Sequence, residues 1–346
     1  MGSNTPQQPV VVGQNRHSGE TQPSGQLRVL THKQSLSWQG RVLRPIFWVR
    51  RAARKMTASN QPDEIYVAKK RVSGDKTAQR FKPISPIRCE QVAVDRIAAE
   101  WITPADADPP NPAKSTILYL HGGSYTGGSI VSHRPLAGSI ACLAQARALL
   151  FNYRLAPEHP FPAALDDART AYQWLLNNSV EPRKIVVVGD SAGGGLALAL
   201  LTVLRDNGLQ LPAAAVCISP WTDLECAGDS WDANADHDVL LDPVLLRRSA
   251  KMYLNGVDPH TPLASPLYAD LRGLPPLLIQ AGTREILLSD STRLAHSAHD
   301  AGVDVTLDLW DGMVHGWHYA VSLLPEARAA IENIREFISF HTTQEK

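Results

Sequence analysis

The stretch Val188-Gly189-Asp190-Ser191-Ala192-Gly193-Gly194 stands between two apolar runs of different character. The run before it, Ile185-Val186-Val187, is short and β-branched and is typical of a buried strand, whereas the run 196–201 is rich in Leu and Ala and is typical of a helix. Gly-x-Ser-x-Gly in this context predicts a nucleophile elbow, a sharp turn whose small residues leave the serine exposed at the tip. The helix would point the partial positive charge of its N-terminus at Ser191. A glycine-rich turn with an ordinary surface serine is the alternative, and the neighbouring motifs decide between the two.

Apolar strands and helices alternate along the chain on both sides of this stretch. Short apolar runs predict strands, and 3.6-residue patterns predict helices. The strands are expected at 89–94, 97–102, 116–120, 149–153, 213–218, 276–280 and 305–310, and the helices at 135–146, 163–176, 241–254, 290–301 and 325–340. Strands that are apolar throughout, separated by helices, indicate an α/β fold with a mostly parallel sheet covered on both faces.

The composition excludes several classes of protein. The 346 residues include 34 Lys and Arg and 34 Asp and Glu, so the formal net charge of +0 gives no reason to expect nucleic acid as a partner. No apolar run approaches the roughly 18 residues of a membrane span, and the N-terminus lacks the apolar region of a secretory signal. The cysteines Cys89, Cys142, Cys217 and Cys226 show no metal-ligand spacing. We therefore expect a cytoplasmic protein without a metal ion, with Cys142 and Cys217 as buried free thiols.

The N-terminal part differs in composition from the rest. Residues 1–27 are polar and rich in Gln, Ser, Gly and Pro, which predicts a disordered tail. The segment 35–56 mixes apolar and basic residues, as does an amphipathic helix that lies on a membrane surface. We favour the other interpretation of this segment, in which its apolar face packs on the protein as part of a lid.

A second glycine motif, His121-Gly122-Gly123-Ser124, follows the strand predicted at 116–120 and lies about 70 residues before Ser191. A backbone loop at this place in the chain, ahead of an elbow, is typical of an oxyanion hole. Acyl transfer puts negative charge on the former carbonyl oxygen, and backbone N–H groups aimed at that oxygen stabilise it. We predict the amides of Gly122, Gly123 and Ala192 as the three donors.

The general base of such a site must follow the serine in the chain. His315 lies in Asp311-Gly312-Met313-Val314-His315-Gly316, directly after the last predicted strand, which places it on a loop at the carboxyl edge of the sheet. His318 shares that loop and remains an alternative. His296 and His299 fall on one face of a predicted helix, where we expect them to face solvent.

Five segments in order resemble the hormone-sensitive lipase family of α/β-hydrolases, the HGG-type carboxylesterases. They are HGGS at His121, YRLAPEHPFPAA at Tyr153, GDSAGG at Gly189, SPWTDL at Ser219 and GMVHG at Gly312. The resemblance implies an α/β-hydrolase domain at 85–224 and 261–346. It also implies a cap built from the N-terminal segment 28–84 and an insertion at 225–260. One departure is Ser124, which stands where the family has a third glycine.

The acid of the triad is the second departure from the family. The family pattern Asp-x-Leu reads Glu285-Ile286-Leu287 here, so we predict Glu285 as the acid, on the loop after the strand at 276–280. Asp290 is the first alternative, although a position at the start of a helix explains it better as a cap. Asp311 is the second alternative, but its own loop would bring it to His315 from the wrong direction.

These residues together predict a serine carboxylesterase that hydrolyses short- to medium-chain esters through an acyl-enzyme and needs no cofactor. A lipase or an amidase could use the same triad. A non-catalytic small-molecule receptor is a further alternative, although the plant gibberellin receptors that resemble this family lack the working histidine. The oligomeric state stays open, with a homodimer among the alternatives.

Overall fold

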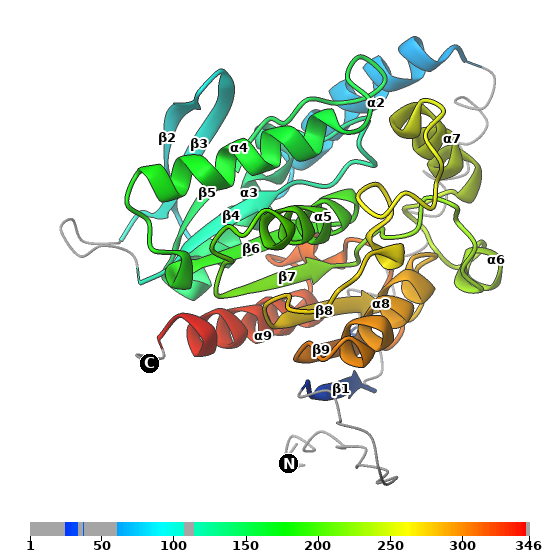
Figure 1. Cartoon of the computed structure of the whole chain (residues 1–346). Coiled ribbons are helices and arrows are strands. Elements are labelled where there is room, and N and C mark those ends of the chain that lie inside the picture. Colours follow the sequence, from blue (N-terminus) through cyan, green and yellow to red (C-terminus); the bar gives the residue numbers. More distant parts are fainter. Residues whose placement is uncertain (1–24, 34–36, 38–60, 107–113, 344–346) are drawn as a thin grey trace, which may run out of the picture.

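The computed structural model describes residues 25–33, 37, 61–106 and 114–343, and their centre is one mixed sheet (Figure 1). In this part of the chain the sheet has nine strands in the order β1-β9-β8-β7-β6-β4-β5-β3-β2. The strands are β1 (Leu27–His32), β2 (Ile87–Val94), β3 (Ile97–Pro104), β4 (Thr116–Leu120), β5 (Arg147–Phe151), β6 (Ile185–Asp190), β7 (Ala214–Ile218), β8 (Leu277–Gly282) and β9 (Val305–Trp310). Pairing is parallel from β1 to β5, while β3 is antiparallel to both β5 and β2. The predicted α/β class with a mostly parallel sheet is confirmed.

Helices cover both faces of this sheet. They are α2 (Asp63–Ala78), α3 (Ile130–Ala144), α4 (Ala163–Asn177), α5 (Ala192–Asp206), α6 (Ser230–Ala233), α7 (Pro243–Leu254), α8 (Leu288–Asp300) and α9 (Pro325–Thr342), with short 3-10 turns η1 (Pro182–Lys184), η2 (Pro266–Tyr268) and η3 (Trp317–Ala320). Helices α4, α5 and α8 share one hydrophobic core with the sheet, and α3 and α9 share the other. Along β4, Leu118 and Leu120 enter the first core, whereas Ile117 and Tyr119 enter the second. This two-sided burial explains why the central strands are apolar throughout.

Strand β1 was not expected from the sequence. Leu27–His32 pairs in parallel with β9 along its whole length. Sequence analysis assigned Leu27 to the disordered tail and residues 28–32 to the cap, whereas all six residues form an edge strand of the sheet. Leu27 and Val29 pack against the core, while Arg28 and Thr31 are exposed. A half-buried edge strand of six residues carries too weak an alternation to be distinguished from a loop.

Two helices also differ from the sequence expectation. No helix was predicted at 60–85, yet α2 occupies Asp63–Ala78, and only Val67 and Ala78 of it are buried. A helix with so few buried positions shows no apolar stripe in its sequence. Helix α3 begins at Ile130, before Pro135, because the side chain of Ser129 caps it in a reciprocal capping box with Ser132.

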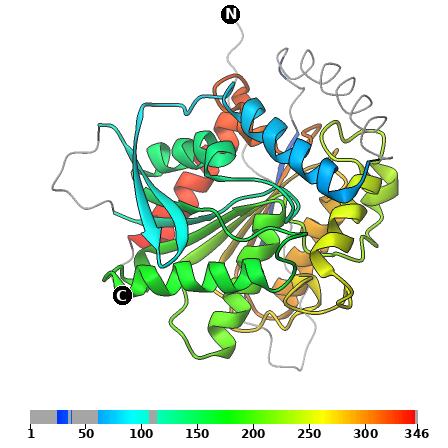
Figure 2. The same cartoon turned by 90° about the horizontal axis from the view of Figure 1, so that it is seen from above.

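Helices α2 and α7 lie over the end of the sheet that carries the sequence motifs (Figure 2). Arg248 of α7 forms an ion pair with Asp63 at the start of α2. On the other side of α2, Arg71 donates to the carbonyl oxygens of Thr126 and Ala156 and pairs with Glu158. Helices α2 and α7 fall within the ranges 28–84 and 225–260 that the family resemblance assigns to a cap.

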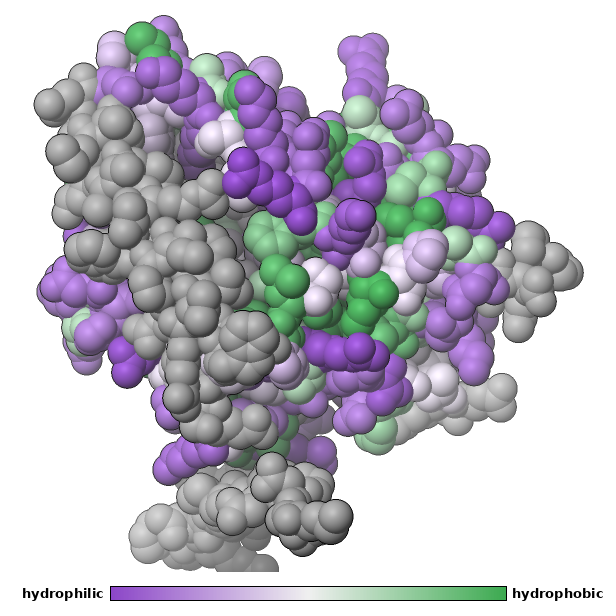
Figure 3. Space-filling view, turned by 180° about the vertical axis from the view of Figure 1, so that it is seen from behind, coloured by the Kyte–Doolittle hydropathy of each residue, from purple (hydrophilic) through white to green (hydrophobic). Residues whose placement is uncertain are grey.

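The tail 1–24, and all of the basic segment 35–56 except Ser37, lie outside the described residues. Within the described ranges, no helix combines the length and the hydropathy needed to cross a bilayer. Figure 3 shows the face opposite to that of Figure 1, where hydrophilic residues surround a group of hydrophobic residues near the middle of the coloured part. All four cysteines are free and Cys142 and Cys217 are buried, as predicted.

Candidate active site

Ser191 occupies the elbow between β6 and α5, with φ 55° and ψ −121°. A non-glycine residue with positive φ is strained, and such strain is typical of functional sites. The neighbours have to be small for steric reasons, since a Cβ on Gly189 would collide with the carbonyl oxygen of Gly193. A Cβ on Gly193 would likewise collide with the carbonyl oxygen of Leu120. The amide of Ser191 donates to the carbonyl oxygen of Ile218 at 2.8 Å, which ties the elbow to β7.

Glu285 and His315 meet at this end of the sheet. The Nδ1 atom of His315 is 2.8 Å from Oε2 of Glu285, and both side chains are buried. The other carboxylate oxygen of Glu285 accepts from the amide of Gly282 at 2.6 Å and from the hydroxyl of Ser219 at 3.0 Å. Ser191 and His315 line the same small cavity. The structure thus brings together all three residues that sequence analysis predicted as a triad.

The surroundings of His315 favour its charged form. Burial by itself lowers the pKa of this imidazole. The hydrogen bond to Glu285, together with the negative charges of Glu285, Asp238 and Asp190, outweighs burial and raises the pKa above its ordinary value. This is the arrangement that stabilises an imidazolium formed when a histidine takes a proton from a serine.

The alternative residues have other partners. Asp290 is buried and accepts from the amides of Thr222 and Asp223 and from the indole of Trp231, and burial raises its pKa to about 7. Asp311 accepts from the hydroxyl of Thr283. The Nε2 atom of His318 is hydrogen-bonded to Oε1 of Gln280 at 2.9 Å, and burial lowers the pKa of His318 to about 3.

The oxyanion loop differs from the prediction at one residue. The amide of Gly122 donates to Asp190 and to Nε2 of His133, both at 3.0 Å, so Gly122 is not free to bind an oxyanion, and its predicted role is wrong. The amides of Gly123, Ser124 and Ala192 donate to no acceptor within the described part of the chain. The three free donors are therefore Gly123, Ser124 and Ala192, and sequence reasoning missed Ser124.

Asp190 is a further residue that sequence reasoning missed. Its carboxylate accepts from the hydroxyls of Tyr119 and Tyr319, both at 2.9 Å, and from the amide of Gly122. Although burial favours the neutral acid, His133 and the two tyrosines hold the pKa of Asp190 well below its usual range. Its position next to Ser191 was the available signal, because a charged residue between a buried strand and an elbow needs buried partners.

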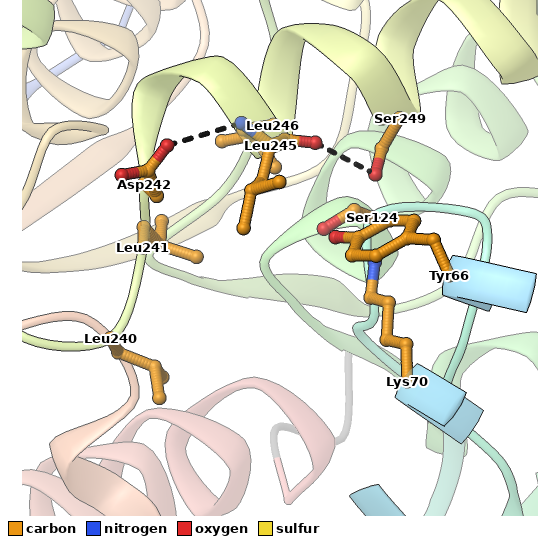
Figure 4. Close-up of a pocket in the computed structure, with 9 residues that line it drawn as sticks. All are labelled: Tyr66, Lys70, Ser124, Leu240, Leu241, Asp242, Leu245, Leu246 and Ser249. Atoms are coloured by element: carbon orange, nitrogen blue, oxygen red, sulfur yellow. Dashed lines mark hydrogen bonds between the residues drawn. The ribbon is translucent and has the colours of Figure 1, made fainter. Parts of the chain in front are cut away.

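A pocket opens beside Ser124, between α2 and α7 (Figure 4). Its volume is about 80 Å³. The residues that line it are Tyr66, Lys70, Ser124, Leu240, Leu241, Asp242, Leu245, Leu246 and Ser249. Tyr66 and Lys70 come from α2, and the leucines come from α7 and the segment before it (Figure 4). An apolar wall beside free amides suits the carbon chain of a small neutral molecule.

Within the described ranges, no group of three or more His, Cys, Asp or Glu side chains could hold a metal ion.

Residues 117–319 match the family Abhydrolase_3, described as an alpha/beta hydrolase fold. A crystal structure of an esterase from the bacterial hormone-sensitive lipase family superimposes with a TM-score of 0.81 at 40% identity, covering 89% of this chain and 100% of that one. The chain belongs to the hormone-sensitive lipase family of α/β-hydrolases.

The similar proteins include one named as an acetyl-hydrolase and one whose crystal was soaked with an ester. An acetyl-hydrolase from Streptomyces hygroscopicus is 46% identical over 272 residues, which cover 79% of this chain and 89% of that protein. A structure of EstE5 that was soaked with p-nitrophenyl butyrate superimposes with a TM-score of 0.80 at 42% identity, covering 89% of this chain and 100% of that one. The predicted family and enzyme class are thereby confirmed.

Proposed function

We propose that this carboxylesterase hydrolyses short-chain carboxylic esters through an acyl-enzyme on Ser191. The observation that carries the proposal is the buried Glu285–His315 pair, whose histidine lines one cavity with a serine held at an elbow. The free amides of Gly123, Ser124 and Ala192 support it, since they provide the oxyanion hole that acyl transfer needs.

In the first half of the reaction, His315 accepts the proton of Ser191 as the hydroxyl oxygen attacks the ester carbonyl. Negative charge develops on the carbonyl oxygen, where the three free amides stabilise it. Glu285 keeps the imidazole in the tautomer with its proton on Nδ1 and stabilises the imidazolium. His315 then gives its proton to the departing alkoxide.

In the second half, His315 takes a proton from a water molecule that attacks the acyl-enzyme. The same amides stabilise the second tetrahedral intermediate, and collapse of this intermediate returns the proton to Ser191 and releases the acid. Every step uses side chains and amides of this chain.

Two observations support a short acyl group. The pocket beside Ser124 is small, and Leu240, Leu245 and Leu246 form its wall. The relatives include an acetyl-hydrolase and a protein soaked with a butyrate ester. We also propose a cytoplasmic location, which the free cysteines support, because disulfides are rare in reducing compartments.

The test is a series of p-nitrophenyl esters from acetate to palmitate, with p-nitroacetanilide and emulsified tributyrin and triolein beside it. We expect the largest kcat/KM between two and six acyl carbons and no measurable hydrolysis of the anilide or triolein. A preference for emulsified triolein would identify a lipase, hydrolysis of the anilide an amidase, and the absence of all turnover a binding protein.

A further inference from the structure

The second cap insertion binds the backbone that carries Glu285. The side-chain amide of Asn234 donates to the carbonyl oxygen of Glu285 at 3.0 Å, and the carboxylate of Asp238 accepts from the amide of Ile286 at 3.0 Å. These two bonds hold the two ends of one peptide group, the one that joins Glu285 to Ile286. Ser230 adds a bond at 2.6 Å from its hydroxyl to the carbonyl oxygen of Ile286.

Asp238 also links this peptide group to the pocket wall. Its other carboxylate oxygen accepts from the amides of Leu240 and Leu241, both at 2.9 Å, and the side chains of these two leucines line the pocket. One fully buried carboxylate therefore connects the wall of the substrate pocket to the backbone of the acid residue.

The charge of Asp238 acts on the same pair of residues. Burial raises the pKa of this carboxyl, and the negative charge of Glu285 adds to that effect, while His315 and the backbone amides counteract them. The charged and titratable groups that act on His315 are Glu285, Asp238, Asp190 and the neighbouring His318. Burying a carboxyl costs free energy unless partners compensate it, and buried carboxyls with perturbed pKa values gather at functional sites.

We propose that Asp238 is a positioning residue for the Glu285–His315 pair, so that the insertion that forms the pocket wall also sets the geometry of the triad. This inference rests on the proposed function and adds a residue from the cap to it. Asp238 touches neither Ser191 nor the substrate, and it acts through the Glu285–Ile286 peptide and through its charge.

The test compares Asp238→Asn with Asp290→Asn on p-nitrophenyl butyrate. Asp290 is the matched control, since it is a fully buried carboxylate that also accepts from two backbone amides but does not act on His315. We expect Asp238→Asn to lower kcat by about 10- to 100-fold, because a misplaced triad loses catalysis on this scale, while KM stays within about threefold. Its acidic limb in kcat/KM should move to lower pH, because a negative charge near the imidazole is lost.

Asp290→Asn should keep the acidic limb of the wild-type enzyme. The inference is overturned if Asp238→Asn folds and has the same kcat and the same acidic limb of kcat/KM as Asp290→Asn. If Asp238→Asn does not fold, Asn234→Ala decides, since it removes only the bonds to the carbonyl oxygens of Thr283 and Glu285. A kcat lowered about fivefold at unchanged KM would support the inference, and an unchanged kcat would overturn it.

Glu285→Gln separates this inference from the proposed function. A wild-type kcat in Glu285→Gln would contradict the proposed triad, regardless of the result for Asp238→Asn. If Glu285→Gln is inactive and Asp238→Asn is unaffected, the proposed triad stands and only the positioning role of Asp238 is contradicted.

Discussion

Different contacts hold the carboxyl end of the sheet and the helix α2 that lies over it. At the end of the sheet, Ser191, Glu285 and His315 are buried, and Glu285 has three hydrogen-bond partners within 3.0 Å. Helix α2 of the cap is held by ion pairs whose side chains remain partly exposed. These exposures are 31% and 54% in Arg71–Glu158 and 19% and 52% in Arg248–Asp63.

The difference in how the two regions are held bears on catalysis at the end of the sheet and on substrate selection at α7. Buried, fully bonded groups hold their geometry within the narrow limits that catalysis needs. The exposed ion pairs of α2 contribute only about 0–1 kcal/mol each. We therefore expect changes in the triad and in Asp238, which is bonded to the acid loop, to alter kcat, and changes in the pocket-lining side chains of α7 to alter the choice of substrate.

The largest effect is expected for Ser191→Ala. Loss of the nucleophile should lower kcat for p-nitrophenyl butyrate by more than about 1000-fold, with the remainder due to the oxyanion hole and binding. Circular dichroism should show an intact fold, since the change relieves a crowded turn without adding atoms. If the variant keeps more than about a thousandth of the wild-type kcat, the nucleophile is a residue other than Ser191.

Glu285→Gln should have the next largest effect. The imidazole loses its orientation and the imidazolium its charged partner, so kcat should fall by about 100- to 10,000-fold. Asp290→Asn removes a neighbouring buried carboxylate from the same loop and helix, and its kcat should stay within about tenfold of wild type if it acts only on stability. A larger loss of kcat in Asp290→Asn than in Glu285→Gln would reverse the assignment of the acid.

The pH dependence sharpens the description of the sheet end. His315 must be neutral to accept the serine proton, and its pKa is raised by Glu285 and the nearby carboxylates. As the pH falls through this pKa the imidazolium forms, so kcat/KM should decrease about tenfold per pH unit, beginning above the roughly 6.5 of a free histidine. A rate that stays flat down to about pH 4 would exclude a histidine base.

The smallest effect is expected in the cap. Leu245→Ala should enlarge the pocket wall and raise kcat/KM for p-nitrophenyl hexanoate relative to acetate by about fivefold, with little change in kcat for acetate. Val244→Ala is the matched control, because Val244 lies on the same helix but is 57% exposed and does not line the pocket. Equal selectivity in the two variants would mean that α7 does not select the acyl group.

The sequence predicted the parts of this enzyme that depend on local patterns. The strand at Val305–Trp310 has the predicted bounds, and helix α4 at Ala163–Asn177 differs from its prediction by one residue, because buried strands and amphipathic helices have distinct periods. The elbow was recognisable because its glycines are required by the turn itself. Chain order and loop position selected His315, and the family's Asp-x-Leu pattern was needed as well to select Glu285, whose carboxylate lies 2.8 Å from the imidazole.

Only the tertiary structure decided which groups are left free to act. Sequence analysis chose Gly122 as an oxyanion donor and not Ser124, but Asp190, 68 residues beyond Gly122, occupies the amide of Gly122 by accepting a hydrogen bond from it. Strand β1 exists because β9 offers it an edge, and the hydrogen bond from the amide of Ile286 on the acid loop to Asp238 spans 48 residues. Hydrogen bonds of this kind join segments far apart in the chain, so no local pattern of residues records them.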